Sequence, residues 1–169
     1  MRAVAEAVGT TTRAVYSLFG SKEGLLIDAL AQSAFDFLAD GIDELAETDD
    51  PVADLVAVGV DVVRRLVVEH PALYRIAFQR IAAGFRAGPE VTAARERAWA
   101  RLNHRVERLE RAGLLGAKTV GEAAVELNAM MEGLANAELR GAILRLLPAG
   151  EEETTWREAL CTVVRGFQS

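Results

Sequence analysis

Six polar side chains gather near the start of the chain, and their types suit contacts with nucleic acid. An arginine can fork onto a guanine edge, a threonine can offer its methyl group to thymine, and a tyrosine hydroxyl can donate to a phosphate. A lysine in the first turn of a helix adds its charge to free backbone N–H groups that also favour phosphate. The six residues are Thr11, Thr12, Arg13, Tyr16, Ser17 and Lys22.

Two short helices must position these side chains, and the sequence predicts them over residues 2–8 and 12–18. Gly9 permits the sharp turn between them, and Thr11 can accept a backbone N–H at the start of the second helix. The second helix is about 12 Å long, which matches the width of the DNA major groove. The pattern therefore predicts a helix-turn-helix. The alternative is an ordinary helical hairpin with core aromatics and solvated basic residues.

The stretch VAEAVGTTTRAVYSLFGSKEGLL, residues 4–26, resembles the DNA-binding signature of TetR-family transcriptional regulators. By this resemblance the six polar residues occupy the family's DNA-facing positions. Leu18 stands where the family often has an aromatic residue or histidine. The family's unit also has a helix before the two seen here, so we expect further residues upstream of Met1. The positions that carry the resemblance are Val4, Ala5, Gly9, Val15, Tyr16, Phe19, Ser21, Lys22, Leu25 and Leu26.

The charge distribution favours contact with a polyanion at one end only. The chain of 169 residues has a formal net charge of -6, which argues against coating of nucleic acid by bulk attraction. Its beginning differs, because Arg2, Arg13 and Lys22 face a single acidic residue there, Glu6. We expect a double-stranded DNA operator as the partner of this basic end.

The composition gives little support to other classes of protein. No apolar stretch approaches the roughly 18 residues that a membrane span needs, so we expect a cytoplasmic protein without a membrane partner. One cysteine and two histidines provide no zinc-ligand cluster. No nucleophile paired with a base and no phosphate-binding loop occurs in the sequence. Neither a metal, a cofactor nor an enzymatic activity is expected.

Helical periodicity interrupted by Gly and Pro predicts an all-α fold. Asp50 is the expected N-cap of the second long helix, with Pro51 at its first position. We expect a helix-turn-helix domain over residues 1–28, truncated at its N-terminus, and a ligand-binding and dimerisation domain over residues 29–169. The helices expected after the helix-turn-helix span residues 22–46, 51–70, 72–85, 88–113, 118–146 and 151–167.

Two helix faces of the second domain are candidates for a homodimer interface. Small residues recur every fourth position at Ala129, Gly133, Ala137 and Gly141, which allows close approach of another helix. The last helix carries an apolar stripe of Trp156, Leu160, Val163, Val164 and Phe167. A four-helix interface between two subunits would bury both, as the TetR resemblance implies. The alternative is that both faces are buried within one subunit.

The second domain also resembles a known class and offers a candidate pocket. HPALYRIAF (70–78) and NAMMEGLANAELRGAI (128–143) are similar to a TetR-associated C-terminal class marked by a Trp-His-Gly triplet, which reads Met131-Glu132-Gly133 here. Residues expected to line an effector pocket, or else to be plain core, are Tyr74, Phe78, Trp99, Asn128 and Met130. The arginines at 97, 101, 105 and 108 are interpreted as a solvated face balanced by Glu96, Glu107 and Glu110.

Three functional hypotheses follow. The first is a dimeric repressor that leaves a palindromic operator when an unknown small-molecule effector fixes the spacing of its recognition helices. The second is a helical ligand-binding or interaction protein that no longer binds DNA. The third, an enzyme, has no supporting constellation of residues.

Overall fold

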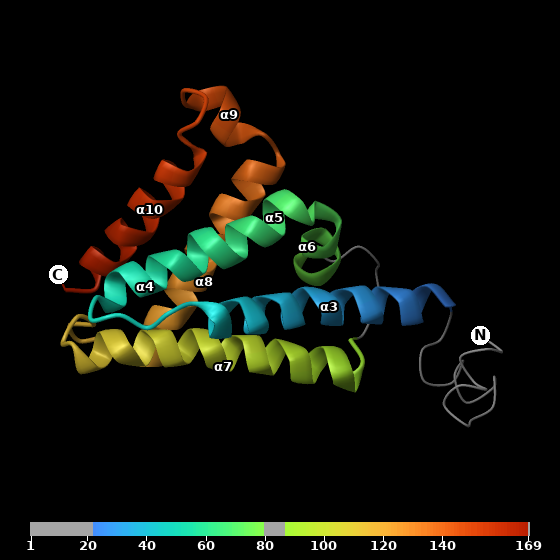
Figure 1. The fold of residues 1–169 in the computed structure, drawn as a ribbon, viewed down its shortest axis with the longest axis horizontal. Coiled ribbons are helices and arrows are strands. Elements are labelled where there is room, and N and C mark those ends of the chain that lie inside the picture. The colour runs from blue at the N-terminus through green and yellow to red at the C-terminus, as the bar shows by residue number, and fades with distance from the viewer. Residues whose placement is uncertain (1–21, 80–86, 169) are drawn as a thin grey trace.

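The computed structural model describes residues 22–79 and 87–168, and no strand occurs within these two ranges. The predicted all-α class is confirmed for this part of the chain (Figure 1). The expected helices over residues 2–8 and 12–18 lie outside the described residues. So do Thr11, Thr12, Arg13, Tyr16 and Ser17, whereas the backbone of Lys22 begins the first described helix.

Two long helices form the base of the molecule. α3 (Lys22–Glu44) and α7 (Pro89–Arg111) lie side by side and run in the same direction (Figure 1). Their facing sides are apolar, with Phe35 and Leu38 of α3 and Val106 of α7 buried. α3 continues without a break across the predicted domain boundary between residues 28 and 29. That division of the chain into two domains stays a prediction.

A second rod crosses the base and consists of three consecutive segments. These are α4 (Pro51–Ala57), the π-helical segment η1 (Val58–Arg64) and α5 (Arg65–Glu69) (Figure 1). The predicted cap at the start is confirmed, because Asp50 Oδ1 accepts from the backbone N–H groups of Val52 and Ala53 at 3.0 and 2.9 Å. The π-helical segment was not expected from the sequence. Such segments are rare in proteins, and those that occur often lie at functional sites.

Four further helices complete the described fold. α6 (Pro71–Phe78) is short, and α8 (Val120–Leu139), α9 (Ala142–Leu146) and α10 (Glu152–Gly166) follow. The prediction of one helix over residues 118–146 is wrong, because Gly141 has a φ of 64° and ends α8 in the left-handed conformation. Gly141 therefore does not continue the row of small residues on α8. Thr119 begins α8 with a capping box that includes Glu122.

α10 packs closely against η1 and α8 of the same subunit. A Cβ added to Gly59 of η1 would lie 2.2 Å from Leu160 Cδ1, so a larger residue at this position would require the Leu160 side chain to move. Trp156 and Leu160 are fully buried, and Trp156 Nε1 donates to Glu138 Oε2 of α8 at 2.7 Å. Within the described ranges, no helix has both the length and the apolar character that crossing a bilayer requires.

Candidate functional site

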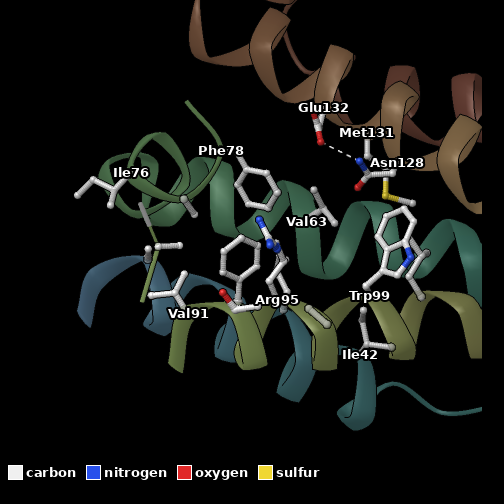
Figure 2. Close-up of a pocket in the computed structure, with 18 of the residues that line it drawn as sticks. Ile42, Val63, Ile76, Phe78, Val91, Arg95, Trp99, Asn128, Met131 and Glu132 are labelled. Atoms are coloured by element: carbon white, nitrogen blue, oxygen red, sulfur yellow. Dashed lines mark hydrogen bonds between the residues drawn. The ribbon is translucent and has the colours of Figure 1, made fainter. Parts of the chain in front are cut away.

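A cavity of about 690 Å3 lies between the two base helices, the crossing rod and α8 (Figure 2). Ligand sites for small organic molecules occupy about 300–1,000 Å3, so the cavity is of suitable size. Its walls are mostly apolar. The lining residues are Ile27, Ala31, Phe35, Leu38 and Ile42 of α3, Val58 and Val63 of η1, Ile76, Ala77 and Phe78 of α6, Ala87, Val91, Thr92, Arg95, Ala98, Trp99 and Leu102 of or next to α7, and Asn128, Met131 and Glu132 of α8.

Aromatic rings form much of the wall between α3 and α6. The ring centroids of Phe35 and Phe78 are 5.3 Å apart, and Tyr74 stacks on Phe78 at 4.7 Å with an angle of 19° between the planes. Trp99 of α7 contributes another ring and keeps 37% of its surface exposed. A bound molecule would therefore meet π-faces as well as aliphatic groups.

Polar groups enter the cavity from opposite walls. Figure 2 shows Asn128 and Glu132 on α8, and Arg95 rising from α7 on the other side. Asn128 Nδ2 donates to Glu132 Oε1 at 2.7 Å. Tyr74 is buried, and its hydroxyl has no hydrogen-bond partner among the described residues. Burial raises the pKa of Tyr74, and the negative charge of Glu132 raises it further.

The structure brings together three of the five residues expected at an effector pocket, namely Phe78, Trp99 and Asn128. Tyr74 is a core residue that stacks on the lining residue Phe78. Met130 is partly buried against the core, and its neighbour Met131 lines the cavity instead. One residue corresponds to about 100° around a helix, so a one-residue error moves the side chain to another face.

The sequence analysis missed the α3 wall and the two charged residues, Arg95 and Glu132. A signal for the wall was present, because the lining residues of α3 follow one another at intervals of three or four. Nothing in the sequence indicated that Arg95 and Glu132 face the same space, since they lie on different helices.

Beyond the cavity, arginines of α7 hold the C-terminal end of α3. Arg105 is only 4% exposed, and its guanidinium donates to the backbone carbonyls of Ile42 and Leu45 at 2.8 and 2.7 Å. These carbonyls belong to the last turn of α3 or follow it, where the helix leaves acceptors unpaired. Arg108 pairs with the buried Asp54 of α4 and donates to the carbonyl of Thr48. We call Arg105, Arg108, Thr48 and Asp54 the α3 clamp.

Thr48 also donates to Asp54, through its backbone N–H at 2.8 Å and its hydroxyl at 2.7 Å. Burial by itself raises the pKa of Asp54, but the hydrogen bonds from Arg108 and Thr48 outweigh it and leave that pKa below its usual value. The clamp therefore holds an ionised carboxylate at the junction of α3, α4 and α7.

The interpretation of the arginine row as a solvated face is wrong for its clamp members. Arg105 and Arg108 are 4% and 14% exposed, and their partners lie more than fifty positions away in the sequence. Arg97 and Arg101 are more exposed, and they pair with Asp36 and Asp43 of α3. The expectation failed because it considered only glutamates on the same helix.

The residues expected at a dimer interface fall into two groups. Four residues of the apolar stripe are each at most 3% exposed within one subunit: Trp156, Leu160, Val164 and Phe167. For these four, the alternative of burial within a single subunit is therefore correct. They are corrected to core residues, because α10 turns this face toward η1 and α8. Val163 is partly buried.

The small residues of α8 remain available to a partner. Ala129 and Gly133 are exposed, Ala137 is half-buried, and Val125 on the same side is 57% exposed. A Cβ added to Gly133 would meet no atom within 4 Å. On α10, Thr155, Ala159 and Thr162 are likewise exposed or half-buried. The dimer interface stays a prediction, with the surface of small residues as its candidate.

Comparison with solved structures shows the fold. A structure of a protein with unknown function from Rhodococcus sp. RHA1 superposes with a TM-score of 0.72 at 22% identity, covering 99% of this chain and 84% of that one. The crystal structure of a TetR family transcriptional regulator, PfmR from Thermus thermophilus, gives a TM-score of 0.63 at 21% identity, with coverages of 97% and 86%. A search of curated proteins finds no match.

Two family models match the sequence. Residues 1–29 match the model of bacterial regulatory proteins of the tetR family. Residues 55–163, which are more than half of the chain, match the tetracyclin repressor-like C-terminal domain. The more specific resemblance to the Trp-His-Gly class stays a prediction. With both parts of the sequence matched and the helical architecture shared, the chain belongs to the TetR family of DNA-binding transcriptional regulators.

Proposed function

We propose that this regulator is a homodimeric repressor that a small molecule releases from a palindromic operator. One observation carries the proposal: α3 forms a wall of the cavity along much of its length, from Ile27 to Ile42. The same helix begins at Lys22, inside the segment that matches the DNA-binding family model. A molecule in the cavity therefore touches the helix that leads directly to the DNA-binding end.

The α3 clamp determines which end of α3 a bound ligand is expected to move. Buried hydrogen bonds from Arg105 hold the C-terminal end of α3, so displacement by a ligand is expected to be largest toward its N-terminal end. That end carries the DNA-binding segment. To shift the regulator from nearly all DNA-bound to nearly all free, the ligand must prefer the released conformation by about 5.5 kcal/mol.

Two subunits are needed for operator recognition in this proposal. Paired recognition helices about 34 Å apart would read two successive major grooves of a palindrome. The exposed small residues of α8 support pairing there, because helices approach closely where side chains are small. Gly133→Leu is expected to shift the protein toward monomer in analytical ultracentrifugation. The control Ala100→Leu adds the same side chain at an exposed site on α7 and should leave the dimer intact.

DNA binding itself is tested by fluorescence anisotropy with the DNA upstream of the gene. Arg13→Ala should weaken specific binding by about 1–3 kcal/mol, since the proposal places this arginine on a base edge. Arg111→Ala, in the last turn of α7 and outside the segment that matches the DNA-binding family model, is the matched control and should have little effect. Specific binding that Arg13→Ala leaves unchanged would refute the role of Arg13. A dimer that binds small apolar molecules and no duplex would support the second hypothesis instead.

A further inference from the structure

One carboxylate faces the interior of an otherwise largely apolar cavity. Glu132 of α8 is half-buried, and Asn128 one turn earlier donates to its Oε1 at 2.7 Å (Figure 2). Within residues 22–79 and 87–168, Glu132 Oε2 receives no hydrogen bond. Asn128 thus fixes the orientation of the carboxylate, and no other described residue donates to its second oxygen.

The surroundings of this carboxylate suit a cation. The rings of Phe35, Phe78 and Trp99 line the same cavity, and ring faces attract ammonium groups. The buried hydroxyl of Tyr74, stacked on Phe78, has lone pairs and no partner among the described residues. Glu132 contributes to the raised pKa of Tyr74, so the two groups interact. Tyr74 is a core residue behind this lining, so the carboxylate and the π-faces are the groups in the cavity that an ammonium group would contact.

Arg95 has the opposite charge on the facing wall, and its exposure decides how much it counts. The residue is exposed, whereas Glu132 is half-buried. Water screens an exposed charge, and the same charge acts more strongly where protein excludes water. We therefore expect the charge of Glu132 to act more strongly on a bound molecule than the charge of Arg95, although both residues line the cavity.

We propose that the effector of this cavity is an apolar molecule with a protonated amine, whose nitrogen donates to Glu132 and whose body contacts the aromatic wall. The inference rests on the proposed function, because it names the ligand class of that same cavity. A carboxylic acid would meet repulsion from Glu132, and among the described lining residues it would find a favourable charge only on the exposed Arg95. A neutral alcohol would lose the charge-assisted hydrogen bond.

Three probes with one body and different head groups test this directly. Isothermal titration calorimetry on the full chain would compare 4-phenylbutylamine, 4-phenylbutanol and 4-phenylbutyrate. We expect the amine to bind at least about tenfold more tightly than the alcohol, and the carboxylate to bind most weakly. Equal affinities, tighter binding of the carboxylate, or no binding of any probe would overturn the proposal.

Variants of the cavity assign the preference to Glu132. Glu132→Gln keeps the size and the hydrogen bond to Asn128 but should abolish the preference for the amine. Glu132→Asp keeps the charge and should retain part of the preference, which guards against a loss caused by misfolding. Glu126→Gln, on the same helix but paired with Lys118 at the surface, is the control and should behave as the parent chain. A preference that survives Glu132→Gln would also overturn the proposal.

Release from DNA is measured separately, by anisotropy of the bound upstream fragment with each probe. An amine that binds without releasing DNA would contradict the proposed function and leave the ligand class intact. Release by the alcohol or the carboxylate, with the amine inactive and unbound, would contradict the ligand class and leave the proposed function intact.

Discussion

The two ends of the α3–α7 pair differ in chemistry although the same two helices form both. At the C-terminal end, the buried guanidinium of Arg105 joins the two helices through the backbone carbonyls of Ile42 and Leu45, and Arg108 joins α7 to the ionised Asp54 of α4. Toward the N-terminal end, Ile27, Ala31 and Phe35 face the cavity. Asp28 accepts from the N–H of Gly88 at 3.1 Å and is a polar link between α3 and the start of α7 there.

This difference indicates how one helix can be both anchored and responsive. Buried hydrogen bonds are directional and are lost at a large cost, so the clamped end has a defined geometry. Apolar contacts around a cavity lack that directionality and leave room for another occupant. The comparison predicts that changes at the clamp alter stability, whereas changes in the cavity alter mobility and DNA affinity.

The largest effect on stability is expected from Arg105→Ala. The change removes a buried donor and leaves the carbonyls of Ile42 and Leu45 without it, which should cost about 3 kcal/mol of unfolding free energy. Urea denaturation measures the loss. Arg97→Ala removes the more exposed pair with Asp36 and should cost less than about 1 kcal/mol. Equal losses in the two variants would remove the distinction between the clamp and the surface pairs.

Asp54→Asn should have a smaller effect, about 2 kcal/mol at pH 7, because the amide keeps part of the hydrogen bonding but loses the charge. The folded pKa of Asp54 is lowered from 3.8, so its contribution is present above that value and lost as the pH falls through the folded pKa. The unfolding free energies of the parent and variant should therefore converge in strong acid. A difference that stays constant down to pH 2 would show that charge is not the cause.

The cavity end is expected to respond to filling with little change in stability. Ala98→Phe places a ring in the cavity, and Ala100→Phe places the same ring at an exposed site on α7. In hydrogen–deuterium exchange, Ala98→Phe should slow the amides of the cavity wall, residues 27–42, several-fold and leave residues 43–46, beyond the last lining residue Ile42, nearly unchanged. A uniform change along α3 would mean that its two ends are not distinct.

Local signals in the sequence predicted the helical class and several helix ends. Asp50 and Pro51 mark the start of α4, and the periodicity of residues 22–46 is confirmed to within two residues at the end of α3. Gly141 shows the limit of such signals. Spacing of four made it a member of a helical row, but a glycine can adopt positive φ, and a residue in that conformation ends an α-helix.

Contacts between distant segments account for what the sequence did not predict. Arg105 has partners near position 45, and Glu132 and Arg95 share a cavity from different helices, so no local spacing reveals either arrangement. The stripe on α10 was identified correctly as apolar. The surface that covers this stripe could not be predicted, because the sequence pattern of the stripe is the same whether η1 or a second subunit packs against it.

The operator affinity of a cavity-filled variant tests the account most directly. Fluorescence anisotropy with the upstream DNA fragment, at one fixed salt concentration, would compare Ala98→Phe with Ala100→Phe. If occupation of the cavity displaces α3 and thereby the DNA-binding end, Ala98→Phe should bind the operator at least about tenfold more weakly, a difference of about 1.4 kcal/mol. Equal affinities in two folded variants would contradict the coupling of the cavity to DNA.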